Sequence, residues 1–183
     1  MVLKFITSNI HKYEEALLIG EKYEINISHE NLEYVESQND SFSEIARFSL
    51  DNLKGKIQGD FFIEDAGLVI ECLNGFPGPY SSFVYSTIGN QGILELMRNE
   101  KNRNAKFIST VALFYKNKEF LFVGECHGNI ASEIKGEHGF GYDPIFIPNG
   151  KNISFGQLDV DEKSLLSHRS IAINKMIKFL KEN

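Results

Sequence analysis

Residues 3–12 read Leu3-Lys4-Phe5-Ile6-Thr7-Ser8-Asn9-Ile10-His11-Lys12, an apolar run that gives way to a polar turn. The run at 3–7 predicts a buried strand, and the spacing of Ala16, Leu17 and Ile19 predicts a helix from 11 to about 22. Asn9 is a suitable N-cap for that helix. Because a short turn from a strand into a helix presents backbone N–H groups to an anion, this stretch predicts an α/β fold with an anion-binding turn.

Strand-like and helix-like patterns continue along the chain. Further strands are predicted at 23–27, 61–63, 107–115, 120–126 and 145–148, and further helices at 42–57, after Tyr80, at 91–98 and at 164–181. The order is an α/β region, then a β hairpin, then a last helix. It predicts a mixed α/β fold with a bent sheet and a cleft between two lobes, formed by a single domain of residues 1–183.

The composition is that of a globular protein without a basic surface. The 183 residues are 42% hydrophobic, and 25 acidic against 19 basic residues give a net charge of −6. This charge argues against a broad nucleic-acid-binding surface. Cys72 and Cys126 lack metal-ligand spacing, and no apolar run is long enough for a membrane span or a signal peptide. We therefore expect a cytoplasmic protein that binds neither nucleic acid nor membranes.

The turn at 7–12 carries groups suited to phosphate. Thr7, Ser8 and Asn9 are hydrogen-bond donors, and Lys12 adds a positive charge one turn into the helix. The alternative is an N-capped surface helix with an exposed lysine.

Glu64 and Asp65 follow an apolar strand. Paired carboxylates at a strand end hold Mg²⁺ and activate water, which is one interpretation of this pair. The other is a strand that simply ends in solvent.

A third cluster suits a nucleobase. It reads Gly139-Phe140-Gly141-Tyr142-Asp143-Pro144. Glycines allow close approach of the backbone, an aromatic ring offers a stacking face, and a carboxylate accepts hydrogen bonds from a base edge. Near the end of the chain, Lys163, His168 and Arg169 are suited to phosphates or to an oxygen on a base; the alternative is a solvated basic helix face.

These segments, in this order, resemble the inosine triphosphate pyrophosphatase family of nucleoside-triphosphate pyrophosphatases. The matching pieces are residues 7–12, Glu64-Asp65-Ala66-Gly67, residues 73–81, residues 139–146, and Glu162-Lys163 with Ser167-His168-Arg169. The resemblance implies a long mixed, bent β-sheet flanked by helices, in two lobes with a central cleft. It also implies hydrolysis of non-standard purine triphosphates (ITP, dITP, XTP) to the monophosphate and pyrophosphate, Mg²⁺ as cofactor with Mn²⁺ as an alternative, and a homodimer.

The resemblance further implies roles for individual residues. Asp65 is the catalytic base. Substrate is bound by Thr7, Ser8, Asn9, Ile10, His11, Lys12, Ala66, Phe140, Gly141, Tyr142, Asp143, Lys163, His168 and Arg169, and the metal by Glu36, Glu64 and Asp65. The chain departs from the family pattern at Ala66, where Ser or Thr is usual, at Ser49, where many members carry Lys, and at Ser82, where some members carry Lys.

Selectivity is expected at purine position 6. A 6-oxo group accepts a hydrogen bond from the Arg169 guanidinium or a protonated His168, whereas a 6-amino group leaves these donors unpaired. Two other functions stay open at this point: a broad-specificity nucleoside-triphosphate pyrophosphatase, and a nucleotide-binding regulator that does not hydrolyse its ligand.

Overall fold

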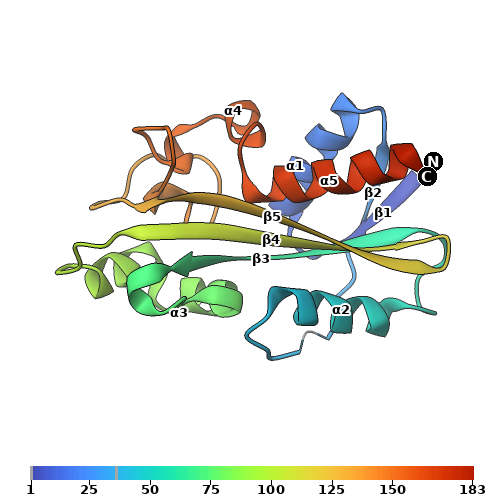
Figure 1. Cartoon of the computed structure of the whole chain (residues 1–183), viewed down its shortest axis with the longest axis horizontal. Helices are drawn as coiled ribbons and strands as arrows, with labels where there is room; N and C mark the ends of the chain where they lie inside the picture. Colours follow the sequence, from blue (N-terminus) through green and yellow to red (C-terminus); the bar gives the residue numbers. More distant parts are fainter. Residues whose placement is uncertain (1, 36) are drawn as a thin grey trace. The chain divides into compact units, whose positions relative to one another are not determined.

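The computed structural model describes residues 2–35 and 37–183. Its strands are β1 (Val2–Ile6), β2 (Asn26–Glu30), β3 (Phe61–Ile70), β4 (Asn104–Tyr115), β5 (Lys118–Ile130) and β6 (Phe146–Pro148). Its α-helices are α1 (Ile10–Lys22), α2 (Phe42–Leu53), α3 (Ser81–Leu96), α4 (Val160–Ser164) and α5 (His168–Glu182) (Figure 1).

The described strands form one mixed sheet in the order β2-β1-β3-β4-β5-β6. β1 runs parallel to both β2 and β3, whereas β5 and β6 are antiparallel. β4 and β5 are joined by Lys116 and Asn117, whose φ angles of 48° and 62° are those of a two-residue hairpin turn. The mixed sheet flanked by helices that the sequence predicts is confirmed.

The chain divides into two compact units, in agreement with the two predicted lobes. Unit 1 comprises Met1–Asp65, Ser109–Gly124 and His168–Asn183, and unit 2 comprises Ala66–Ile108 and Glu125–Ser167. β3, β4 and β5 each begin in one unit and end in the other. That residues 1–183 act as a single domain stays a prediction.

Unit 1 has a core on each face of its part of the sheet. On one face, Leu3 and Phe5 of β1 pack with residues of α1 and α5, including Ala16 and Ile173. On the other face, residues of α2 pack against Ile6, Phe61 and Ile63. Figure 1 shows α1 and α5 on one side of these strands and α2 on the other. Neighbouring residues of a strand point to opposite faces, so Phe62 lies in the core with α1 and α5 and Ile63 in the core with α2.

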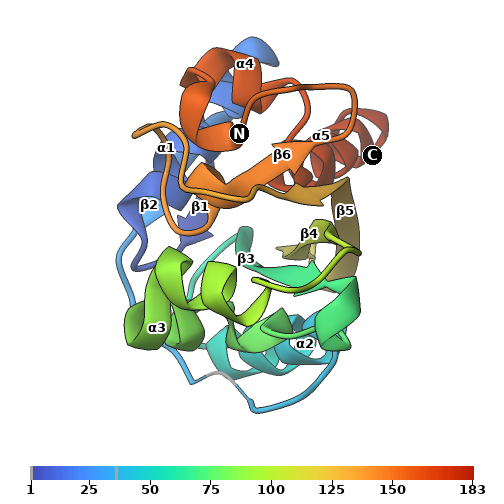
Figure 2. The same ribbon diagram turned by 90° about the vertical axis from the view of Figure 1, so that its left-hand side faces the viewer.

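Unit 2 has a core of its own, built from β3, α3, β6 and the segment around Phe155. β6 pairs with the end of β5, as Figure 2 shows. α3 is interrupted at Gly89, whose φ of 60° and ψ of −165° are not helical. The two short helices predicted in this region therefore correspond to the two pieces of α3.

Three predicted boundaries are wrong. The second strand runs over Asn26–Glu30 instead of 23–27, because Tyr23 and Ile25 donate to the Gly20 carbonyl and close the end of α1. α2 ends at Leu53 instead of 57, because Lys54 is extended and Gly55 has a φ of 81°. The last helix, α5, begins at His168 instead of 164, because Ser164 is the last residue of α4, a separate helix that Asp159 caps.

The prediction that Glu64 and Asp65 lie at a strand end is also wrong. β3 continues from Phe61 to Ile70, so both acids lie in the middle of a strand. The apolar residues after them, Leu68 and Ile70, are fully buried in unit 2, which explains why the strand goes on.

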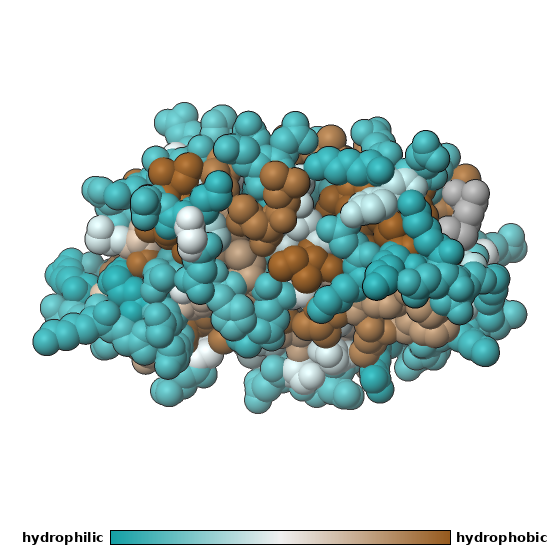
Figure 3. All heavy atoms as spheres, turned by 45° about the horizontal axis from the view of Figure 1, so that its top comes forward, coloured by the Kyte–Doolittle hydropathy of each residue, from teal (hydrophilic) through white to brown (hydrophobic). Residues whose placement is uncertain are grey.

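Hydrophilic residues predominate on the face drawn in Figure 3, where hydrophobic residues stand in separate groups. In unit 2, several large apolar side chains of the segment 76–88 are exposed: Phe76, Tyr80, Phe83, Tyr85 and Ile88. Within the described part of the chain, no helix is long and apolar enough to cross a membrane.

Candidate active site

The turn between β1 and α1 is held by its own side chains. The Asn9 side chain accepts hydrogen bonds from the backbone N–H groups of His11 and Lys12 (3.0 and 3.3 Å), which confirms Asn9 as the N-cap. The Asn9 backbone N–H in turn donates to Thr7 Oγ1 at 3.1 Å. Ser8 and Ile10 are exposed. The turn is therefore preorganised before any ligand binds.

His29 supports this turn from β2, a role that the sequence does not indicate. Its Nε2 donates to the Thr7 carbonyl at 2.8 Å, and its ring stacks on Tyr13 with centroids 4.6 Å apart. Since a carbonyl only accepts, this contact requires the proton on Nε2.

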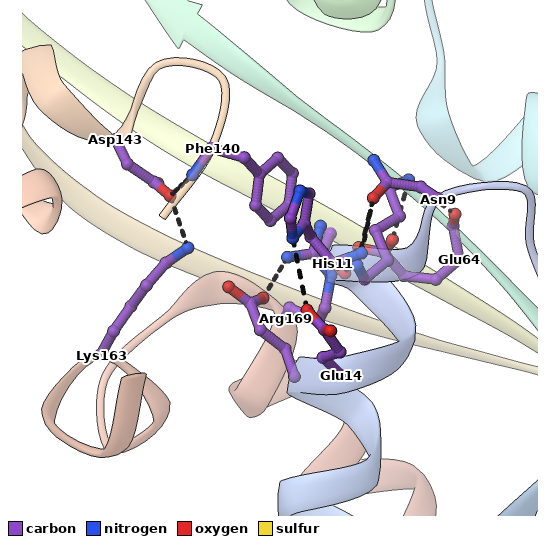
Figure 4. A network of polar contacts seen from close by, with 11 residues as sticks. Asn9, His11, Glu14, Glu64, Phe140, Asp143, Lys163 and Arg169 are labelled. Atoms are coloured by element: carbon purple, nitrogen blue, oxygen red, sulfur yellow. Dashed lines mark hydrogen bonds and ion pairs between the residues drawn. The ribbon is translucent and has the colours of Figure 1, made fainter. Parts of the chain in front are cut away.

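Glu64 is the centre of a buried set of charges in unit 1. Its Oε2 pairs with Lys12 Nζ at 3.0 Å, and its Oε1 pairs with Arg169 Nε at 3.2 Å. Ser109 of β4 donates to Oε1 at 2.5 Å, and Glu15 of α1 pairs with the Arg169 guanidinium. We call Lys12, Glu15, Glu64, Ser109 and Arg169 the Glu64 network; part of it is drawn in Figure 4. It joins the 7–12 turn to the start of α5.

The surroundings of Glu64 keep its carboxylate ionised. Burial alone raises the pKa of this side chain, which is 2% exposed. The charges of Arg169 and Lys12, the Ser109 hydrogen bond and the His168 charge oppose burial, and the pKa falls well below its usual value of 4.5. Glu64 is thus a buried anion shared by two cations.

Arg169 and His168 are buried, so the alternative of a solvated basic helix face does not apply to them. They are 2% and 3% exposed, at the start of α5. A Cβ at Gly124 of β5 would lie 2.1 Å from the His168 carbonyl oxygen, so the glycine lets this end of α5 lie directly on the strand. Arg169 is fixed by Glu15 and Glu64, neither of which was predicted to hold it.

The structure separates Glu64 from Asp65. Glu64 points with Phe62 toward α1 and α5, so the next residue, Asp65, points toward the α2 face of β3. The Glu64 carboxylate is engaged by Lys12, Arg169 and Ser109, and the metal site predicted for this pair stays a prediction. Glu36, the third predicted ligand, lies outside the described residues. Among the described residues, no three His, Cys, Asp or Glu side chains form a metal-binding group.

In unit 2, the predicted nucleobase segment is a compact loop, Gly139–Asp143, which we call the ring loop. Asp143 Oδ2 accepts from the Phe140 backbone N–H at 2.8 Å and from Lys163 Nζ at 2.7 Å (Figure 4). Lys163 Nζ also lies 5.0 Å from the centre of the Phe140 ring. A Cβ on Gly139 would come within 2.2 Å of Asp143 Oδ2, so only glycine fits there. Asp143 and Lys163 therefore hold the loop that presents Phe140.

Tyr142 supports the loop from inside unit 2. It is 4% exposed, its hydroxyl donates to the Ser81 carbonyl at 3.0 Å, and its ring meets Tyr85 edge-on. Burial raises the pKa of this hydroxyl. The Tyr142 side chain is packed in the core of unit 2, and the predicted role of Tyr142 in substrate binding stays a prediction.

Comparison with known proteins identifies the family. The model of the Ham1 family matches residues 3–179. The chain belongs to the Ham1 family. The family resemblance drawn from the sequence is thereby confirmed.

Relatives of this Ham1 chain match it along its whole length. A dITP/XTP pyrophosphatase of Methanopyrus kandleri is 46% identical and covers 100% of this chain and 98% of its own. A dITP/XTP pyrophosphatase of Korarchaeum cryptofilum is 47% identical, over 96% of this chain and 94% of its own. The structure of a HAM1 protein from Coxiella burnetii superposes with a TM-score of 0.87 at 26% identity, with 100% of both chains covered.

Proposed function

We propose that this protein hydrolyses non-standard purine nucleoside triphosphates, dITP, ITP and XTP, to the monophosphate and pyrophosphate. The observation that carries the proposal is the placement of Lys12 and Arg169 on one buried carboxylate beside a preorganised helix N-terminus. Such a site binds phosphate groups. The printed activity of full-length relatives at 46% and 47% identity supports the choice of substrate.

The roles of the residues follow from their places. The positive N-terminal end of α1 and the Lys12 ammonium bind phosphate oxygens, and Glu64 keeps Lys12 in place. Phe140 stacks on the base, and Arg169 with His168 donates to its 6-oxo group. Asp65 takes a proton from the water that attacks the α-phosphorus, and pyrophosphate leaves with its charge held by Lys12.

We also propose that the reaction needs a divalent cation, Mg²⁺ or Mn²⁺, which supplies charge neutralisation at the phosphates. Asp65 and Glu36 are its proposed ligands. The occupied carboxylate of Glu64 does not support Glu64 as a third.

We propose further that residues 1–183 act as one catalytic domain in the cytoplasm. The protein is a homodimer, for which the exposed rings of the segment 76–88 offer an apolar surface; Phe83, 69% exposed, is the most open of them.

The test is a pyrophosphate-release assay with ITP, dITP and XTP against ATP and GTP, with products separated. We expect monophosphate and pyrophosphate from ITP, dITP and XTP and none from ATP, whose 6-amino group leaves the donors unpaired, and no product after EDTA until Mg²⁺ or Mn²⁺ is restored. Equal cleavage of ATP would indicate a broad-specificity pyrophosphatase. Nucleotide binding without product, with metal present, would indicate a regulator.

Phe140→Ala should raise the KM for ITP, because substrate binding is weaker, and should leave kcat unchanged. Loss of one base–aromatic stacking contact corresponds to about 1–3 kcal/mol, or roughly 5- to 150-fold in KM. The measurement is KM and kcat for ITP. Phe48→Ala, an exposed phenylalanine on α2, is the matched control; an unchanged KM in Phe140→Ala would mean that no base stacks there.

A further inference from the structure

The break in α3 at Gly89 turns one side chain of the helix toward the ring loop. Asn90 is the first residue after this break. Its Nδ2 donates to the Gly141 carbonyl at 3.0 Å, across 51 residues of sequence and within unit 2. Gly141 lies between Phe140 and Tyr142, so the contact reaches the middle of the loop.

The side chain of Asn90 does not serve its own helix. An asparagine at the start of a helical segment commonly caps it, with the side-chain oxygen accepting from a backbone N–H. Asn90 Oδ1 is buried and has no hydrogen-bond partner among the described residues. A buried acceptor without a partner costs free energy. The orientation of this side chain is therefore explained by its contact with Gly141 and not by the stability of α3.

The ring loop needs such a contact. Gly141 has a φ of 61°, and a Cβ there would meet no atom within 4 Å, so packing around its Cα does not hold it. The residues on either side are held: the Phe140 N–H by Asp143, and the Tyr142 hydroxyl by the Ser81 carbonyl. The hydrogen bond from Asn90 fixes the peptide between them.

We infer that Asn90 is a positioning residue that fixes the ring loop and thereby the place of the Phe140 ring against a purine base. The anchoring of the loop follows from the structure of unit 2, and its consequence for the base rests on the proposed function. Asn90 itself touches no reacting atom. It acts by removing the freedom of the loop before the nucleotide arrives.

The experiment compares Asn90→Ala and Asn90→Asp with wild type in two measurements. The first is hydrogen–deuterium exchange of peptides covering 139–143 without nucleotide, with peptides from β1 as internal reference. The second is KM and kcat for ITP. Asn52→Ala is the matched control, because its amide also donates to a backbone carbonyl, that of Phe48 at 2.8 Å, but on the exposed side of α2.

We expect faster exchange in 139–143 alone, a KM raised about 2- to 10-fold as for the loss of one hydrogen bond, and an unchanged kcat. Asn90→Asp should have at least the effect of Asn90→Ala, because it sets a carboxylate oxygen against the Gly141 carbonyl. Unchanged exchange, or faster exchange with an unchanged KM, would overturn the inference. If wild type did not hydrolyse ITP, the proposed function would be overturned instead, and the same assay would show this.

Discussion

Asp65→Asn is expected to lower kcat for ITP and XTP by about 10²- to 10⁴-fold, the usual contribution of a general base. The amide has the shape of the carboxylate but cannot take a proton from water. Asp65 is half-buried and points away from the Glu64 network, so the exchange leaves that network and the packing of β3 intact. The measurement is kcat by pyrophosphate release, beside the melting temperature.

Asp51→Asn is the matched control for this variant. Asp51 lies on α2 and pairs with Lys54 at 2.6 Å on the surface of the same unit. It should keep full activity. Asp65→Asn with a kcat within about threefold of wild type would remove Asp65 from the role of base, whereas loss of activity with a lowered melting temperature would indicate a structural role instead.

The local features of this fold are predictable from sequence because they depend on local chemistry. Hydrophobic spacing predicts the strand at 2–6 and helix α1. The preference of asparagine for N-caps predicts that Asn9 caps α1. The glycines of the ring loop follow in the same way, since Gly139 and Gly141 have φ angles of 74° and 61°.

The site was less predictable where it depends on contacts that are distant in sequence. Glu15 and Ser109 look like ordinary helix and strand residues, and only the fold brings them to Arg169 and Glu64. Likewise, Leu68 and Ile70 carry β3 past Asp65 into a second core, but Ala66 and Gly67 interrupt the apolar pattern before them. The strand alternation that separates Glu64 from Asp65 becomes visible only once that length is known.

Glu64→Gln is expected to destabilise the protein by about 3–5 kcal/mol, the range for removal of one partner from a buried ion pair. Lys12 and Arg169 would lose the carboxylate between them, and the Arg169 side chain is buried, with 2% exposed. The measurement is the free energy of unfolding in urea. Glu125→Gln is the control. In wild type, Glu125 pairs with Lys106 at 3.0 Å, and both side chains are about one third exposed. This surface ion pair should contribute less than about 1 kcal/mol to the free energy of unfolding.

The free energies of unfolding of wild type and Glu64→Gln should depend differently on pH. The Glu64 pKa is lowered by folding, so its stabilisation is complete above the usual value of 4.5 and is lost as pH falls below it. Wild type should therefore lose up to about 1.4 kcal/mol per pH unit through this one group below pH 4.5, and Glu64→Gln should not. The stability difference between the two should narrow from pH 5 to pH 3, roughly in proportion to that slope. A stability difference that stays constant over this interval would mean that Glu64 is not the shared anion of Lys12 and Arg169. The role proposed for Glu64 in holding Lys12 at the 7–12 turn would then fail.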